Sequence, residues 1–165
     1  MTDPFTAEHV EYASSRSFEA VIATFEAVTG DISGDHFERE LAASKDVPDF
    51  ERRIRSYEGD SGFMRFQTLD HGAWSALYGD PFKARLYILG NPLIARTMMQ
   101  YDLRVGLNVP VRLLIYETAA GEVRLGYDLP SSMMSRLVNA DVTAAARKLD
   151  AKLAALAERV TGAKE

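Results

Sequence analysis

The sequence predicts an α+β protein in which a mixed, largely antiparallel sheet carries helices packed mainly on one face. Three observations support this fold class. Several short segments alternate apolar and polar residues, as half-buried strands do, and the segments between them place apolar residues at helical spacing. The last clear pair of strands is joined by a tight turn, which makes those two strands antiparallel. We therefore expect a single α+β domain over residues 1–165, with mobile ends at residues 1–8 and 161–165.

One strand and one helix are expected in the first part of the chain. Residues 9–16 alternate, which predicts a strand. In residues 18–28 the apolar side chains recur at helical spacing, which predicts an amphipathic helix. Ser17 is suited to cap the start of this helix, and Gly30 is suited to end it.

The next segment predicts a helical hairpin inserted at about residues 31–60. Asp35 and Glu38 have the spacing of a capping box, and Asp46 followed by valine and proline is typical of a second helix start. Weak apolar stripes on both helices favour a hairpin that lies on the main body. A lid over a binding site is the alternative interpretation of the same segment.

The second half of the chain alternates strands and helices in a way that completes the predicted sheet. A strand pair joined by a glycine-containing turn predicts a β-hairpin, and an alanine-rich stretch capped by Asp141 predicts a long C-terminal helix. The expected elements are strands at 63–69 and 84–89, a helix at 93–100, the β-hairpin at 110–128, a helical stretch from 130 and the final helix ending near 160.

The composition restricts the classes of function. A net charge of −5 argues against nucleic-acid binding, because a protein that binds the phosphate backbone carries a basic patch. The chain has no cysteine and only scattered histidines, so we expect no disulfide, no metal and no cofactor. The sequence has no secretory start and no apolar run long enough to cross a bilayer, so we expect a cytoplasmic protein without a membrane partner.

The most distinctive stretch begins at residue 90. A glycine-asparagine-proline turn opens a helix after a strand, and a proline-led strand pair then closes on an aspartate and a proline, at Gly90, Asn91, Pro92, Pro110, Asp128 and Pro130. In this spaced series the chain resembles the family known as domain of unknown function 302. The resemblance implies a compact α+β fold around a shared hydrophobic core. It implies no established activity, and residues 31–60 look like an insertion relative to the shortest members.

The turn at Gly90 and Asn91 is the first candidate site. It lies where a buried strand ends and a helix begins, a place where ligands gather in α/β folds and where free N–H groups hold anions. The alternative is structural: the glycine turns the chain and the asparagine caps the helix. Met98 in that helix and Met133 in a later one suit either an ordinary core or a pocket for an apolar ligand.

His71 is the second candidate, because a carboxylate precedes it at the end of an apolar strand. An imidazole oriented by a carboxylate acts as a general base, and the carboxylate would come from Asp70 or from the more distant Asp128. The alternative is that Asp70 caps a helix while His71 bonds to the backbone. Trp74 would then pack beside them or line a pocket. We assign no catalytic residue and keep His71, Asp70 and Asp128 as the candidates.

The leading hypothesis for function is a non-catalytic module that binds a small, partly apolar ligand. We expect its site between the sheet and the methionine-bearing helices, formed by Gly90, Asn91, His71, Trp74, Arg104, Met98 and Met133. One alternative is a homo-oligomeric interaction domain, a homodimer through the exposed side of the final helix or an open sheet edge. The other is an acid–base enzyme that uses His71. The arginine at position 104 alternatively pairs with Asp102.

Overall fold

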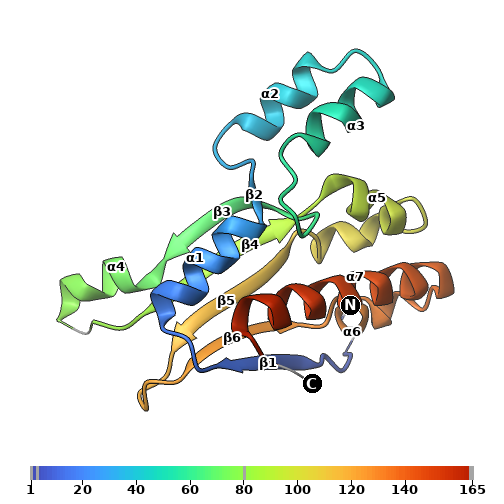
Figure 1. Cartoon of the computed structure of the whole chain (residues 1–165). Helices are drawn as coiled ribbons and strands as arrows, with labels where there is room; N and C mark the ends of the chain where they lie inside the picture. Colours follow the sequence, from blue (N-terminus) through green and yellow to red (C-terminus); the bar gives the residue numbers. More distant parts are fainter. Residues whose placement is uncertain (1, 3, 80, 164–165) are drawn as a thin grey trace.

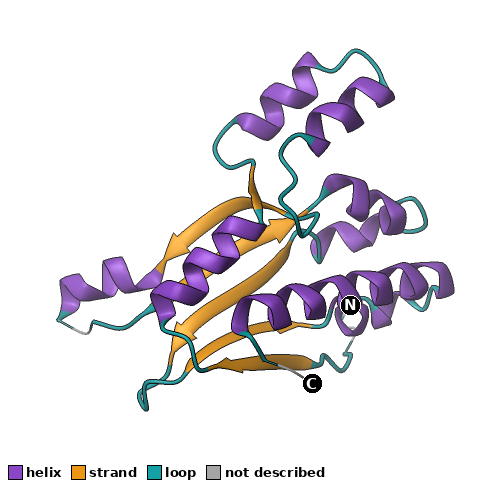
Figure 2. Ribbon diagram, in the orientation of Figure 1, coloured by secondary structure: helices purple, strands orange, loops and turns teal. Residues whose placement is uncertain are grey.

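A six-stranded sheet forms the centre of the computed structural model, which describes residues 2, 4–79 and 81–163 (Figures 1 and 2). The strands follow one another in space in the order β1-β6-β5-β4-β3-β2. β2 pairs with β3 in parallel, and the other neighbouring pairs are antiparallel. The mixed, largely antiparallel sheet is therefore confirmed. The strands are β1 His9–Ser14, β2 Gly30–Asp31, β3 Met64–Asp70, β4 Ala84–Gly90, β5 Val111–Glu117 and β6 Val123–Asp128.

Helices connect many of these strands and follow the last one. In Figure 1 the helices α1 and α7 lie across the same face of the sheet, while α2 and α3 project beyond it. The α-helices are α1 Phe18–Val28, α2 His36–Ala43, α3 Val47–Arg55, α4 His71–Ser75, α5 Pro92–Met99, α6 Pro130–Met133 and α7 Ala140–Thr161. Three short 3₁₀ turns complete the described part, η1 Ala76–Tyr78, η2 Leu103–Leu107 and η3 Ser135–Leu137. In residues 2, 4–79 and 81–163, no helix combines the length and the hydropathy needed to cross a membrane.

The main hydrophobic core lies between α1, α7 and the sheet. Phe25 of α1 packs on Tyr87 of β4 with ring centroids 4.4 Å apart, and both side chains are fully buried. Ala146 and Ala157 of α7 are also fully buried, so their small side chains let α7 lie close to its neighbours. The amphipathic patterns predicted for both helices therefore point their apolar sides into one core.

The opposite face of the sheet is more polar and more exposed. Arg112 is exposed there, and Glu11 of β1 accepts a hydrogen bond from Arg124 of β6 at 2.9 Å. His9 contacts Asp128 at 2.9 Å on the same face. This difference between the faces confirms that the helices pack mainly on one side of the sheet.

The inserted hairpin consists of α2 and α3, as the sequence predicts. It contacts the body at its base rather than lying flat over it, through a second cluster of buried residues, Ile32, Ile54 and Met64. Phe37 of α2 meets Phe66 of β3 edge to face, with ring centroids 5.7 Å apart. The hairpin therefore has its own small core, separate from the one under α1 and α7.

The helix caps agree with the sequence at three positions and differ at two. Ser17, Asp46 and Asn91 each accept a hydrogen bond from the backbone of the helix that follows. The side chain of Asp35 makes no capping hydrogen bond at the start of α2, and Asn139, not Asp141, caps α7. Asn139 precedes the helix with extended backbone, which turns its side-chain oxygen toward the free N–H groups.

Candidate functional site

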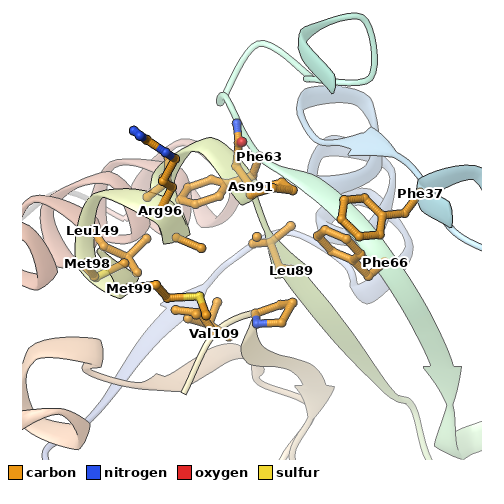
Figure 3. Close-up of a pocket in the computed structure, with 16 residues that line it drawn as sticks. Phe37, Phe63, Phe66, Leu89, Asn91, Arg96, Met98, Met99, Val109 and Leu149 are labelled. Carbon is orange, nitrogen blue, oxygen red and sulfur yellow. The ribbon is translucent and has the colours of Figure 1, made fainter. Parts of the chain in front are cut away.

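A cavity of about 420 Å³ lies where β4 ends and α5 begins. Figure 3 shows its walls: Met98 and Leu149 stand on one side, Phe66 and Phe37 on the other, with Leu89 between them. Cavities of this size hold small organic molecules. Nearly all of the lining is apolar, so the space suits the apolar part of a ligand.

Several elements build the cavity. Phe63, which immediately precedes β3, and Leu89 of the adjacent strand β4 are fully buried. Met98 of α5 is fully buried, while Met99 is half-buried. The inserted hairpin contributes Phe37, so the hairpin forms part of the cavity wall. Sequence elements far apart in the chain therefore create the cavity jointly.

Asn91 acts as the cap predicted for it, and it also ties α5 to the hairpin. Its side-chain oxygen accepts from the N–H of Leu93 at 2.9 Å. Its amide nitrogen donates to the carboxylate of Glu58 at 2.7 Å and to the carbonyl of Gly62 at 2.9 Å. The side chain is almost fully buried, and its donors and acceptor are engaged with protein. Asn91 therefore holds the cavity in shape.

Gly90 is needed for a close approach. A Cβ atom at this position would lie 3.1 Å from the Cβ of Pro110, which is tighter than most contacts between such atoms. The peptide bond before Pro110 is cis. Gly90 and Pro110 both line the cavity. Two residues of the spaced series that resembles the family therefore meet at the cavity wall.

The structure separates His71 and Trp74 from this cavity. Asp70 pairs with Arg85 near the start of β4, whereas Met64 pairs with Gly90 at its end. His71 and Asn91 consequently lie near opposite ends of the β3–β4 pair. The expectation that both residues contribute to one ligand site is wrong, because the C-terminal ends of two antiparallel neighbouring strands point in opposite directions.

Among the described residues, the groups around His71 do not form the candidate dyad. The indole N–H of Trp74 donates to Nδ1 of His71 at 3.1 Å. Asp70 accepts from the N–H of Ala73 at 2.9 Å and from Arg85 at 3.0 Å. These contacts, the Ala73 N–H foremost, keep the pKa of Asp70 below its usual value. Asp70 is thus a helix cap and an ion-pair partner.

The remaining candidate residues, Asp128, Arg104 and Met133, lie outside the cavity. Asp128 lies at the end of β6 and contacts His9, whereas the described side-chain contact of His71 is with Trp74. Arg104 binds Asp102, with Nη2 and Oδ2 2.7 Å apart, as the structural alternative predicts. Met133 lines a second, more polar hollow of about 610 Å³, which has Val109, Pro110 and Val111 in common with the first. Of the predicted ligand-binding set, the cavity therefore contains Gly90, Asn91 and Met98.

Sequence reasoning missed most of the aromatic wall. Phe63 and Phe66 belong to a predicted strand, and Phe37 belongs to the predicted hairpin, but no local pattern shows that they meet. Arg96 also lines the cavity, and it is not among the candidate residues predicted from the sequence. Its position five residues after the Asn91 cap, in the same predicted helix, is the signal that could have placed it near the turn.

The fold and the cavity define a class of protein: an α+β domain with an open six-stranded sheet and an apolar cavity beside the turn into α5. The family described as domain of unknown function DUF302 matches residues 38–160. The chain belongs to this family, as the spaced series of residues predicts. Membership brings no specific function with it.

A solved structure has the same fold. It is a crystal structure of an uncharacterised conserved DUF302 protein from Bacillus stearothermophilus, with a TM-score of 0.66 and 16% sequence identity. The match covers 92% of this chain and 97% of that one. At this level of identity the likeness concerns the fold alone.

Curated relatives with a named activity match only part of the chain. The fluoride-specific ion channel FluC 1 of Brucella suis biovar 1 (strain 1330) is 33% identical over 86 residues, which are 51% of this chain and 34% of that protein. A channel of the same name from Brucella abortus biovar 1 (strain 9-941) is 33% identical over 86 residues and is covered to 32%. The chain thus spans about a third of the length of these relatives.

Proposed function

We propose that this protein is a non-catalytic module that binds a small, largely apolar ligand in the cavity beside α5. The observation that carries the proposal is the cavity itself, about 420 Å³ in volume and lined mainly by aromatic, methionine and aliphatic side chains. An apolar ligand that enters a space of this size removes its own surface and that of the lining side chains from water. Met98 and Met99 suit ligands of varied shape.

The same proposal includes the setting in which the module acts. We place it in the cytoplasm, which the absence of cysteine supports, and we expect no nucleic-acid partner because the net charge is −5. The channel activity named for the Brucella proteins belongs to whole proteins of which this chain matches about a third. We do not extend that activity to this chain.

A variant that fills the cavity tests the proposal. Ala95 is a half-buried residue of α5 that lines the cavity, and Ala95→Phe places a ring where the ligand would lie. We expect Nile red, a neutral apolar dye, to bind the unaltered protein with a rise in fluorescence. Its affinity for Ala95→Phe should fall by about tenfold or more, because ligand and ring would compete for one volume.

The matched control is Gln100→Phe, which adds a ring at the exposed end of the same helix and outside the cavity. This variant should bind the dye as the unaltered protein does. Thermal unfolding of both variants establishes that they fold. Equal binding by Ala95→Phe and Gln100→Phe would place the dye elsewhere and refute the proposed site.

A specific observation also favours the assembly function as a second candidate. Residues 71–79, 81 and 82, which we call the aromatic arm, expose large apolar side chains: Trp74 is 53% exposed, Leu77 86%, Tyr78 80% and Phe82 46%. A cluster of this kind on one projecting segment is typical of an interaction surface. We propose that a second copy of the chain covers it. On α7, one of the two surfaces that the sequence suggests, the exposed side carries charged residues and alanines.

A further inference from the structure

The cavity has very few polar groups that a ligand can reach. Among its lining residues only Asn91 and Arg96 have polar side chains. Asn91 is fully engaged, since its oxygen binds Leu93 and its nitrogen binds Glu58 and Gly62. Arg96 is therefore the side chain that remains to bind a polar end of the ligand.

Arg96 is available for such a role. It is exposed on α5, and no described residue forms an ion pair or a side-chain hydrogen bond with its guanidinium. Other arginines differ: Arg53 and Arg85 each lie within 3.2 Å of a carboxylate. In Figure 3 the guanidinium of Arg96 points away from the apolar wall, while its stem lies beside the cavity. This is the geometry of a cation at the rim of an apolar space.

The surface next to the cavity is also cationic. A neighbouring groove of about 370 Å³ shares Ile94, Asn91 and Leu149 with the cavity wall. It is lined by three basic side chains, Arg55, Lys148 and Lys152, and by one carboxylate, that of Glu58. The ammonium group of Lys152 also stands 5.8 Å from the ring centre of Phe63, a cavity residue.

This local excess of positive charge contrasts with the net charge of the whole chain, which is −5. Like charges gathered around one opening raise the local concentration of anions and disfavour cations. Glu58 and Glu51 lie 4.0 and 3.9 Å from Arg55 and offset its charge, so the excess comes from Lys148 and Lys152. An anion is therefore favoured at this end of the molecule.

We infer that the ligand is an amphipathic carboxylate, with its apolar tail in the cavity and its carboxylate on Arg96. The inference rests on the proposed function and adds the chemical class of the ligand. The planar guanidinium matches a carboxylate with two parallel hydrogen bonds, and one cation neutralises one such anion. The aromatic and methionine side chains around Met98 accept an unbranched tail without demanding a particular shape.

Calorimetric titration of the full chain with decanoate and with decanol tests the inference, because the two compounds share a tail and differ in the head group. We expect decanoate to bind roughly twofold to fivefold more tightly, because Arg96 is exposed and water screens an ion pair with its guanidinium. Arg96→Gln should remove this preference by weakening decanoate and leaving decanol unchanged. Arg96→Lys should restore part of it, because the charge is kept and the planar fork is lost.

Three variants locate the head group. Arg147→Gln, at an exposed position of α7 that lines neither the cavity nor the groove, should leave both titrations unchanged. Lys148→Gln and Lys152→Gln should have a smaller effect on decanoate than Arg96→Gln. A larger effect at either lysine would overturn the assignment to Arg96. The melting temperature of each variant confirms that it is folded.

The outcomes separate this inference from the proposed function. Equal affinity for decanoate and decanol in the unaltered protein would refute the carboxylate class while supporting an apolar site. Binding of neither compound, together with no binding of Nile red, would refute both. Tight binding of decanoate that Ala95→Phe does not weaken would also refute the inference, because the tail would then lie outside the cavity.

Discussion

At the scale of single residues, Asn91 shows how much one side chain does at the edge of the cavity. It caps α5 and joins that helix to Glu58 and Gly62 at the base of the hairpin. The capping role is predictable, because asparagine before proline at a helix start is a local pattern. The two other bonds are not, because they join residues about thirty positions apart that only the fold brings together.

A graded pair of variants measures these roles. Asn91→Ala removes the cap and leaves buried groups without partners, so the free energy of unfolding should fall by about 2 kcal/mol or more. Asn91→Ser keeps an oxygen that caps the helix and loses the two donated bonds, so it should cost roughly half as much. Urea unfolding of the three proteins gives both values. Equal stability of the serine and alanine variants would assign no part to the cap.

At the scale of elements, the base of the inserted hairpin is the part that local patterns describe least. Two glycines face each other where the chain enters and leaves the hairpin, and both Gly30 and Gly59 donate to the carbonyl of Phe63, at 2.9 and 3.2 Å. The sequence predicts Gly30 as a helix end, whereas the structure places it in the short strand β2. A two-residue parallel strand has no alternation to detect, so only its tertiary partner β3 reveals it.

The close contact at this base leads to a prediction. A Cβ atom on residue 30 would lie 1.6 Å from the backbone oxygen of Tyr57, and that oxygen cannot turn away as a side chain would. Gly30→Ala should therefore lower the free energy of unfolding by about 3 kcal/mol or more. Gly34→Ala is the control in the same segment: its backbone has φ of +73° but the space around it is empty. It should cost only about 1 kcal/mol.

Thermal and urea unfolding of both variants check this expectation. A cost for Gly30→Ala no larger than that for Gly34→Ala would mean that the hairpin shifts to admit the methyl group. The hairpin would then be movable at its base, which is what the lid interpretation requires. A large cost at Gly30 favours a fixed wall that holds Phe37 at the cavity.

At the scale of the whole molecule, strand order decides which predicted residues meet. His71 and Asn91 each follow an apolar strand, so the sequence makes them look alike. Because β3 and β4 are antiparallel neighbours, the residues that follow them lie at opposite ends of this strand pair. The single ligand site expected from the sequence is therefore divided between two regions of the molecule. The fold class and most elements are predictable from periodicity, while sheet order and the aromatic wall depend on pairings between distant segments.

The same separation places the cavity and the aromatic arm at opposite ends of the molecule. In Figure 1, α4 extends from the sheet on the side away from α5, so contact through the aromatic arm would leave the cavity open. The edge-to-face contacts of Trp74 with Tyr78 and Phe82, both at 6.3 Å, keep these rings together as one surface. A two-fold contact between two such arms is the simplest closed assembly.

We therefore expect sedimentation equilibrium to show a dimer of the unaltered chain, and the double variant Leu77→Ser, Tyr78→Ser to shift it toward monomer by about tenfold or more in dissociation constant. The control is the double variant Leu103→Ser, Leu107→Ser on η2, because these two leucines are 79% and 81% exposed. That control should remain dimeric. A monomer at every concentration, or an equal loss of dimer in both variants, would refute assembly through the arm. Because the cavity lies at the other end, ligand affinity should be the same in monomer and dimer.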